Sequence, residues 1–321
     1  MTSTLRTSEP LRLLESTRAR ARPARAIAAS LRAAIGASWS AHERAFPLHQ
    51  SDSITFDRTE PVETECFSIA TILDLCGHHV DAPTRRAAQR SLLDDLARSG
   101  DLVRFFRSER LPPDADCTAV AALALWELGA LDTRRARSIA SRLLDHRTRD
   151  GRISVYFDDE GERAERVDAV VTCNVLRFAT QVGIAERSAS DVEQIRAALG
   201  SPTRYYPADV LLFAAARLVH ARADLAPALA PMLREALAAR RASEATSLEQ
   251  ACRAAAAFYA GLEAEHVLDL ALPLRDVSRP LRPEPFFSLG RRASYFGSTP
   301  LTAAFRLHAI TLGASVGAGH D

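Results

Sequence analysis

A pair of carboxylates stands at the start of an apolar segment, in the stretch LPPDADCTAVAALALWELG at residues 111–129. Two prolines precede Asp114 and Asp116, and Cys117 follows them. Aspartate is a favoured N-cap, so the pair could serve only to start a helix. A carboxyl group at the edge of an apolar cavity can instead donate a proton, provided that burial and nearby negative charge raise its pKa. Both interpretations, capping and acid chemistry, are open at this stage.

Composition narrows the classes of function. The formal net charge is +1, which gives no electrostatic reason to expect a nucleic acid partner. The chain contains no lysine, so a mechanism through a lysine Schiff base is excluded. The 5 cysteines form no CxxC pair, and their odd number argues against a disulfide framework. No apolar run resembles a signal peptide or reaches membrane-spanning length, so we expect a cytoplasmic protein without a transmembrane segment.

Apolar helices that end in glycine recur along the chain. The glycines are Gly77, Gly129, Gly183, Gly261 and Gly313. A glycine after the last apolar turn is a common C-terminal cap of a helix. Residues 207–219 supply one more apolar segment in the widest gap. Helices with a single apolar face alternate with these segments, and we predict them at 82–98, 133–147, 190–199 and 224–240.

This alternation predicts two layers of helices. Helices that are apolar on all sides must be surrounded, and one-sided helices must surround them. Six inner helices favour an all-α fold, a closed (α/α)6 toroid with almost no sheet, over an open solenoid. We expect the inner helices near 65–77, 117–129, 168–182, 207–219, 247–261 and 300–313. We divide the chain into an Ala/Arg-rich helical extension, residues 1–55, and the toroid, residues 56–321.

Parallel inner helices would bring their N-termini to one rim of the toroid. Acidic residues stand at the starts of four of them: Glu65, the pair Asp114 and Asp116, Asp168, and Asp209. Taken singly, each is most simply a helix cap. Because the helices are expected to be parallel, we predict that Glu65, Asp114 or Asp116, and Asp168 line one cavity mouth.

The segment PDADCTA, which starts at Pro113, resembles the PxDxDDTA signature of class II terpene cyclases and squalene–hopene cyclases. The surrounding helix pairs resemble the prenyltransferase/squalene-oxidase repeat, which forms an α/α toroid, with partial matches at 167–176, 204–218 and 295–307. The sequence departs from the family in three ways. The third acid is Cys117, Arg147 and Ile153 stand where the family's glutamine and tryptophan would, and 321 residues accommodate only one toroid.

The resemblance implies a function and a set of site residues. In the family the middle aspartate protonates an alkene or epoxide, which implies that Asp116 is the catalytic acid and that Asp114 tunes it. The substrate would be an apolar, isoprenoid-like molecule, and no cofactor is expected. Aromatic faces stabilise carbocations. The residues that we expect around the substrate are Glu65, Cys117, Trp126, Asp168, Asn174, Tyr205, Tyr206, Phe213, Tyr295 and Phe296.

Other functions stay open. The toroid could bind an apolar ligand or a partner protein without catalysis, or it could be an (α/α)6 hydrolase with two rim carboxylates. Zinc, which the related protein prenyltransferase β-subunits bind, is not expected, because Asp116 and Cys117 would point about 100° apart on a helix. Asp114 with Cys117 and His308 is the less unfavourable zinc set. Arg291 and Arg292 could hold a diphosphate, although a solvated loop is the simpler interpretation.

The N-terminal extension has several compatible roles. Its helical spacing would allow it to pack on the toroid, close one end of it or mediate a homodimer. A basic amphipathic helix could also rest on a membrane surface that holds a lipid substrate.

Overall fold

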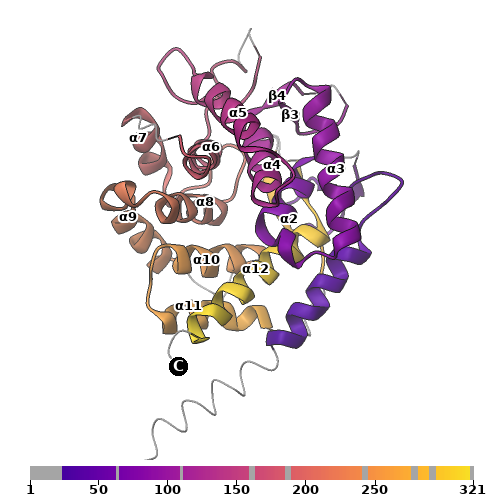
Figure 1. Cartoon of the computed structure of the whole chain (residues 1–321). Coiled ribbons are helices and arrows are strands. Elements are labelled where there is room, and N and C mark those ends of the chain that lie inside the picture. Colours follow the sequence, from indigo (N-terminus) through magenta and orange to yellow (C-terminus); the bar gives the residue numbers. More distant parts are fainter. Residues whose placement is uncertain are drawn as a thin grey trace, which may run out of the picture.

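The computed structural model describes residues 24–62, 65–108, 111–158, 163–184, 189–240, 245–275, 281–288 and 294–318. Helices dominate this part of the chain and form an inner and an outer layer (Figure 1). None of the described helices is both long and apolar enough to cross a lipid bilayer.

Six helices form the inner layer of the described chain. They are α2 (Phe67–Cys76), α4 (Ala115–Glu127), α6 (Ala169–Gln181), α8 (Ala208–Ala221), α10 (Ser247–Tyr259) and α12 (Thr299–Ala318). Each packs against the next, and α12 packs against α2, so the ring closes. Nearly all residues in the first three turns of these helices are buried, because neighbours surround each helix. The predicted all-α toroid and its six inner segments are confirmed.

The outer helices lie at the periphery of the ring (Figure 1). They are α3 (Ala82–Arg98), α5 (Thr133–Asp145), α7 (Ala189–Ala198), α9 (Ala226–Ala238) and α11 (Ala264–Ala271). Single turns of 3-10 helix occur at η1 (Gly77–His79), η2 (Ala223–Leu225) and η4 (Leu272–Arg275). Helix α5 buries one stripe, formed by Ala136, Ile139, Ala140, Leu143 and Leu144. Its remaining face carries arginines, as expected of a helix that covers the inner ring.

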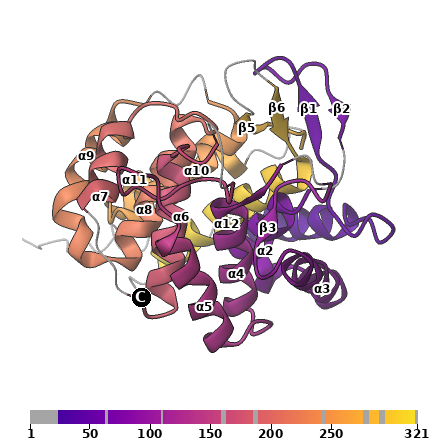
Figure 2. The same ribbon diagram turned by 90° about the horizontal axis from the view of Figure 1, so that it is seen from above.

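A further helix at residues 24–37 completes the outer layer. Ile27, Leu31 and Ile35 on this helix are buried and belong to the same hydrophobic core as the inner ring. Figures 1 and 2 show the helix beside α3 and α12. This segment therefore packs on the toroid, while the division at residue 55 stays a prediction. Residues 1–23 of the predicted extension lie outside the described residues.

Glycine ends some of the inner helices but not all. Gly129, Gly183 and Gly261 follow α4, α6 and α10 with φ of 70°, 79° and 66°, which L-residues with side chains rarely adopt. The prediction was wrong for Gly313, which lies inside α12. Gly77 has a φ of −54° and continues from α2 into η1.

The inner helices run in the same direction. Asp116, in the first turn of α4, accepts hydrogen bonds from Asn174 on α6 and from Tyr206, which directly precedes α8. Asp74, near the end of α2, accepts hydrogen bonds from Arg177 on α6 and Arg217 on α8. Both arginines lie in the second halves of their helices. Helix starts thus meet at one rim and helix ends at the other.

A sheet of short strands lies to one side of the helices (Figure 2), and a second pair of strands lies beside α4. β1 (His49–Ser51), β2 (Glu60–Pro61), β5 (Pro285–Ser288) and β6 (Tyr295–Gly297) form an antiparallel sheet in the order β2-β1-β6-β5. β3 (Val103–Arg104) pairs with β4 (Pro113–Asp114), which leads directly into α4. Residues from both sheets reach the rim where the inner helices start, and there they contribute to the site described below.

Candidate active site

The two carboxylates of the PDADCTA segment have different roles. Asp114 is the N-cap of α4: its φ of −132° and ψ of 154° are extended, and its Oδ1 accepts a hydrogen bond of 2.7 Å from the backbone N–H of Cys117. The capping interpretation is therefore correct for Asp114. Its Oδ2 is buried and has no hydrogen-bond partner among the described residues.

Asp116 does not cap the helix. Its side chain leaves α4 toward the interior of the ring, where Oδ1 accepts a 2.8 Å hydrogen bond from the Asn174 side-chain amide. The Tyr206 hydroxyl donates a short hydrogen bond to Oδ2. Asp116 is 3% exposed, so water does not solvate its charge. Asn174, in the middle of the apolar helix α6, thus connects this helix to the acid on α4.

Burial raises the pKa of several carboxyl groups at this rim. It raises the pKa of Asp116 to about 6, and the charge of Asp168 acts in the same direction. The hydrogen bonds from Tyr206 and Asn174 act against this rise, because they stabilise the carboxylate. Burial likewise raises the pKa of Asp114 to about 7, helped by the charge of Asp116. A fraction of Asp116 therefore keeps its proton near neutral pH.

A small cavity of ≈ 40 Å³ adjoins the two aspartates. The lining residues are Phe105, Leu111, Asp114, Asp116, Cys117, Val155, Tyr156, Val171, Tyr205, Tyr206 and Phe287. Most of these side chains are apolar or aromatic, and the polar atoms are concentrated around Asp116. The hydroxyl of Tyr205 is buried, and the side chain of Tyr156 lies beside that of Tyr205 with ring centroids 6.4 Å apart.

Cys117 occupies the position of the third acid in the related signature. Burial, together with the charges of Asp114 and Asp116, raises the pKa of its thiol well above the usual value. The thiol is therefore neutral at pH 7 and adds no negative charge beside Asp116. Burial, with the charge of Asp168, raises the pKa of Asp116 to about 6, so part of it stays protonated without a third carboxylate.

Several lining residues were not predicted from the sequence. Tyr156 and Val155 reach the cavity because residues 153–157 run antiparallel to the start of α4: the N–H of Ala115 donates to the carbonyl of Val155 over 2.8 Å. Phe105, which was also not predicted, follows β3. The only available signal was the alternation of apolar residues in the segment 152–157, RISVYF, which is typical of a strand.

Two predicted acids lie close to the site without lining the cavity. Asp168 is the N-cap of α6, and its Oδ1 accepts a 2.9 Å hydrogen bond from the N–H of Val170. Glu65 precedes α2, is 1% exposed, and accepts a 2.8 Å hydrogen bond from the N–H of Ser68. Neither belongs to the lining of the ≈ 40 Å³ cavity, but the charge of Asp168 acts on Asp116 and raises its pKa. That both acids line the mouth of a shared site therefore stays a prediction.

The remaining predicted residues are distributed through the core. Trp126 is at the far end of α4, where its indole N–H donates to Thr133, so the structure does not bring it to the cavity. Phe213 lies inside the ring and contacts Phe305. Phe296 does not line the cavity, but its ring stacks on that of the lining residue Phe287, with the ring centroids 4.8 Å apart. Tyr295 is half-buried on β6 and does not line the cavity.

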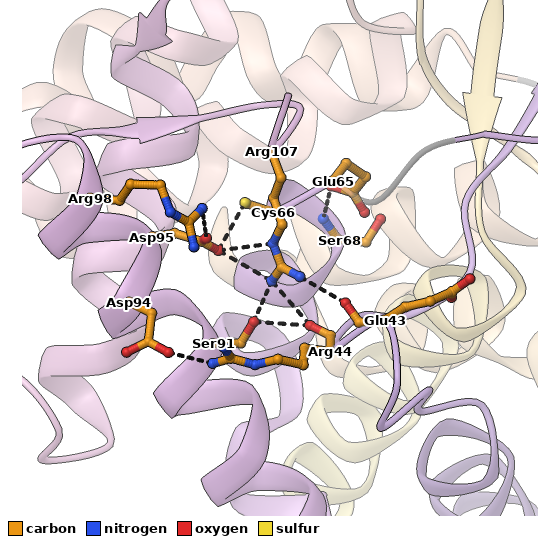
Figure 3. Close-up of polar contacts among 10 residues, drawn as sticks. All are labelled: Glu43, Arg44, Glu65, Cys66, Ser68, Ser91, Asp94, Asp95, Arg98 and Arg107. Carbon is orange, nitrogen blue, oxygen red and sulfur yellow. Dashed lines mark hydrogen bonds and ion pairs between the residues drawn. The ribbon is translucent and has the colours of Figure 1, made fainter. Parts of the chain in front are cut away.

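The wall that carries Phe105 is fixed by a polar cluster around Arg107 (Figure 3). The Arg107 guanidinium donates to the Asp95 carboxylate of α3 over 3.2 Å and to the backbone carbonyls of Glu43 and Arg44 over 2.9 and 3.0 Å. The thiol of Cys66 donates to the same carboxylate over 3.0 Å. Arg107 therefore joins the loop after β3 to an outer helix and to the segment that precedes β1.

The opposite rim holds a second buried charge cluster. The Asp74 carboxylate accepts hydrogen bonds from the Arg177 guanidinium over 2.5 and 3.1 Å. It accepts two more from the Arg217 guanidinium over 2.6 and 3.1 Å. The Nδ1–H of His308 donates to the carbonyl oxygen of Leu75 over 2.8 Å, and its Nε2 accepts a 3.0 Å hydrogen bond from the Tyr259 hydroxyl. Burial and the charge of Arg217 lower the pKa of His308 to about 3, so the ring is neutral. His308 is thus far from Asp114 and Cys117.

The described residues contain no group of three or more His, Cys, Asp or Glu side chains that could hold a metal ion. The absence of zinc stays a prediction that metal analysis would test. Arg291 and Arg292 lie outside the described residues.

Comparison with known proteins agrees with this geometry. Residues 86–182, which include both aspartates, match the family model of the sesquiterpene cyclase AstC-like C-terminal domain. No curated protein sequence matches the chain significantly. The type II terpene cyclase MstE from Scytonema superposes with a TM-score of 0.69 at 13% identity, covering 92% of this chain and 99% of MstE.

Two further solved structures are similar. A protein from Actinoplanes has a TM-score of 0.69 at 17% identity, covering 92% of this chain and 99% of its own. The ent-copalyl diphosphate synthase from Streptomyces platensis has a TM-score of 0.55 at 16% identity, covering 77% of this chain and 50% of the synthase. The chain resembles a single toroid domain of class II terpene cyclases. Because these identities are low, the structural likeness establishes the fold, and the chemistry must be argued from the site.

Proposed function

We propose that this protein is a class II terpene cyclase in which Asp116 protonates an isoprenoid substrate and starts its cyclisation. The observation that carries the proposal is the environment of Asp116: a buried carboxyl group whose pKa is raised to about 6, beside a cavity with largely apolar and aromatic walls. A general acid works best when its pKa lies near the working pH.

The hydrogen bonds to Asp116 suit a proton donor. Burial keeps part of the population protonated, and transfer of the proton to a terminal alkene leaves a carboxylate. Asn174 and Tyr206 then stabilise that carboxylate, which makes Asp116 a stronger acid than burial alone would allow. Protonation of one alkene carbon turns its neighbour into a carbocation, and the next alkene of the substrate attacks that cation. The final carbocation loses a proton, so the overall reaction is an isomerisation.

The walls favour a cyclase over a hydrolase. Phe105 and Phe287 add aromatic rings to the cavity lining, and Val155 and Val171 add aliphatic surface. Aromatic faces stabilise carbocations, whereas a sugar-cleaving site would need polar groups along its length. MstE, which has this fold, has been solved with geranylgeranyl dihydroxybenzoate as its substrate, and one family model describes sesquiterpene cyclases. Both support an isoprenoid substrate here.

The test is turnover by the variant Asp116→Asn. Asparagine keeps the shape of the side chain and can accept from Asn174 and donate to the Tyr206 hydroxyl, but it removes the acid, so we expect loss of at least 100-fold in kcat with little change in stability. Geranyl, farnesyl and geranylgeranyl diphosphates and squalene are the substrates, and mass spectrometry identifies the products. Asp132→Asn is the matched control, because Asp132 caps the outer helix α5 away from the cavity.

A companion variant, Cys117→Asp, restores the third acid. It places negative charge beside Asp116, raises the protonated fraction and should keep or increase activity. Full activity of Asp116→Asn would reject the acid role. Absence of turnover in both the wild type and Cys117→Asp would instead favour a toroid that binds an apolar ligand without catalysis.

A further inference from the structure

The interior of the ring is largely filled by protein. The cavity beside Asp116 measures ≈ 40 Å³, whereas pockets for small molecules usually measure about 300–1,000 Å³. A prenyl chain that enters this site must therefore occupy space that side chains now hold. The identity of those side chains decides how long a chain can be accepted.

Aromatic rings fill the interior below Asp116. Tyr206, which binds Asp116, lies with its ring centroid 5.7 Å from that of Phe286 on β5. Phe286 lies 5.2 Å from Phe305 on α12, and Phe305 lies 5.4 Å from Phe213 on α8. We call Phe286, Phe305 and Phe213 the aromatic column. Helices α8 and α12 are both neighbours of α10 in the ring, so the contact between Phe213 and Phe305 crosses the interior.

Buried charged side chains lie next to the last ring of the aromatic column. The Arg217 guanidinium lies 5.1 Å from the centre of the Phe213 ring and is paired with Asp74, which Arg177 also contacts. A hydrocarbon chain cannot replace these paired charges without leaving some of them buried and unpaired. Any additional chain length must therefore come from the column itself.

Because this inference names a determinant of the substrate, it rests on the proposed cyclase function. We propose that Phe305 limits the length of the prenyl chain that the protein accepts. Phe305 is the middle ring of the column, is 1% exposed and is fixed on an inner helix. Removing its ring would open a space on the order of 100 Å³, comparable to one five-carbon isoprene unit, between Phe286 and Phe213.

The experiment compares farnesyl with geranylgeranyl diphosphate. The wild type should favour the shorter chain, and Phe305→Ala should shift the ratio of kcat/KM toward the longer chain by about 10-fold or more, the usual range for added apolar volume in a pocket. Phe305→Leu should shift it less and serves if the alanine variant does not fold. Leu92→Ala is the control, because Leu92 is equally buried but lies on the outer helix α3, away from the column.

A second measurement separates this inference from the proposed function. In an Asp116→Asn background, calorimetry gives the affinities for farnesyl and geranylgeranyl thiolodiphosphates without turnover. A shift of the affinity ratio by Phe305→Ala without any cyclisation by wild-type protein supports the role of Phe305 and rejects the cyclase. Cyclisation with an unchanged chain-length ratio keeps the cyclase and rejects the role of Phe305. If the protein neither binds nor converts either diphosphate, both the cyclase and the role of Phe305 are rejected. A wild type with equal kcat/KM for the two chains contradicts the length limit.

Discussion

At the scale of single residues, Asp114 and Asp116 differ because of backbone geometry. Asp114 has extended torsion angles and caps α4, while Asp116, two residues later, lies in the first helical turn with its side chain free to meet Asn174 and Tyr206. The sequence placed both aspartates at a helix start. It could not assign the roles, because the partners of Asp116 are 58 and 90 residues away.

The hydroxyl of Tyr206 offers a test of how the acid is tuned. Its hydrogen bond stabilises the carboxylate of Asp116, so Tyr206→Phe should raise the pKa of Asp116 above its value of about 6. Activity requires the protonated acid, so it falls as pH rises through that pKa. We therefore expect the descending limb of the kcat–pH profile to move to higher pH by about 1 unit, with a lower maximal kcat because the acid is weaker. A limb that moves to lower pH would contradict the assignment.

Asp114 should leave a signature in the pH dependence of stability. Its pKa is raised to about 7 in the folded protein from 3.8, so the folded state holds the proton more tightly than the unfolded state. This contribution to stability is lost as pH rises from about 4 to about 7. Asp114→Asn keeps the cap and removes the titration, and its stability relative to wild type should be greater at pH 8 than at pH 5 by roughly 2–3 kcal/mol.

Denaturant unfolding of both proteins at the two pH values provides the measurement. The difference between variant and wild type is needed, because His308, whose pKa is lowered to about 3, contributes in the opposite direction in both proteins. A difference that does not change with pH would show that Asp114 is ionised in the folded state throughout this range.

At the scale of elements, the sequence was informative where patterns are long. Apolar helices such as 208–221 and one-sided helices such as 133–145 extend over three or more turns, so their periodicity can be recognised. The strands contain only 2–4 residues and carry no such signal. Phe105, which follows one of these short strands, was missed for that reason. Arg147 stands where the related family has a glutamine. Its guanidinium donates to the carbonyl of Gly151 and to the carboxylate of Asp191, and so connects the turn that follows α5 to helix α7.

The loop after β3 depends on a tertiary contact that can be tested. Arg107→Gln removes the guanidinium that joins this loop to Asp95, which is 5% exposed (Figure 3). We expect a loss of about 3 kcal/mol in the free energy of unfolding, together with a higher KM because Phe105 is no longer held. Arg98→Gln removes an ion pair with the same carboxylate from a side chain that is 58% exposed, and should cost less than about 1 kcal/mol. Equal losses in urea unfolding would show that Arg107 is not the organising contact.

At the scale of the whole molecule, charges far apart in the sequence brace the ring. Asp74 on α2 reaches Arg177 and Arg217, which are 103 and 143 residues later on α6 and α8. Helices α6 and α8 are separated from α2 by other members of the ring, so these ion pairs span its interior (Figure 1). The sequence indicated the number of helices and their order, because both follow from local periodicity. It did not indicate this brace, because none of the three residues differs in type from a surface charge.

The brace predicts an asymmetric response to mutation. Asp74→Leu leaves two buried guanidinium groups unpaired and should lower the free energy of unfolding by about 3–5 kcal/mol. Asp94→Ala removes an ion pair between side chains that are 47% and 55% exposed, and its effect should be much smaller because water screens such a pair. Replacing Asp74, Arg177 and Arg217 together by leucine or methionine removes the unpaired charges and should recover much of the loss. Urea unfolding of the wild type and of these three variants measures the differences in the free energy of unfolding. If the triple variant is less stable than Asp74→Leu alone, the ion pairs themselves hold the ring closed, and burial of apolar surface cannot replace them.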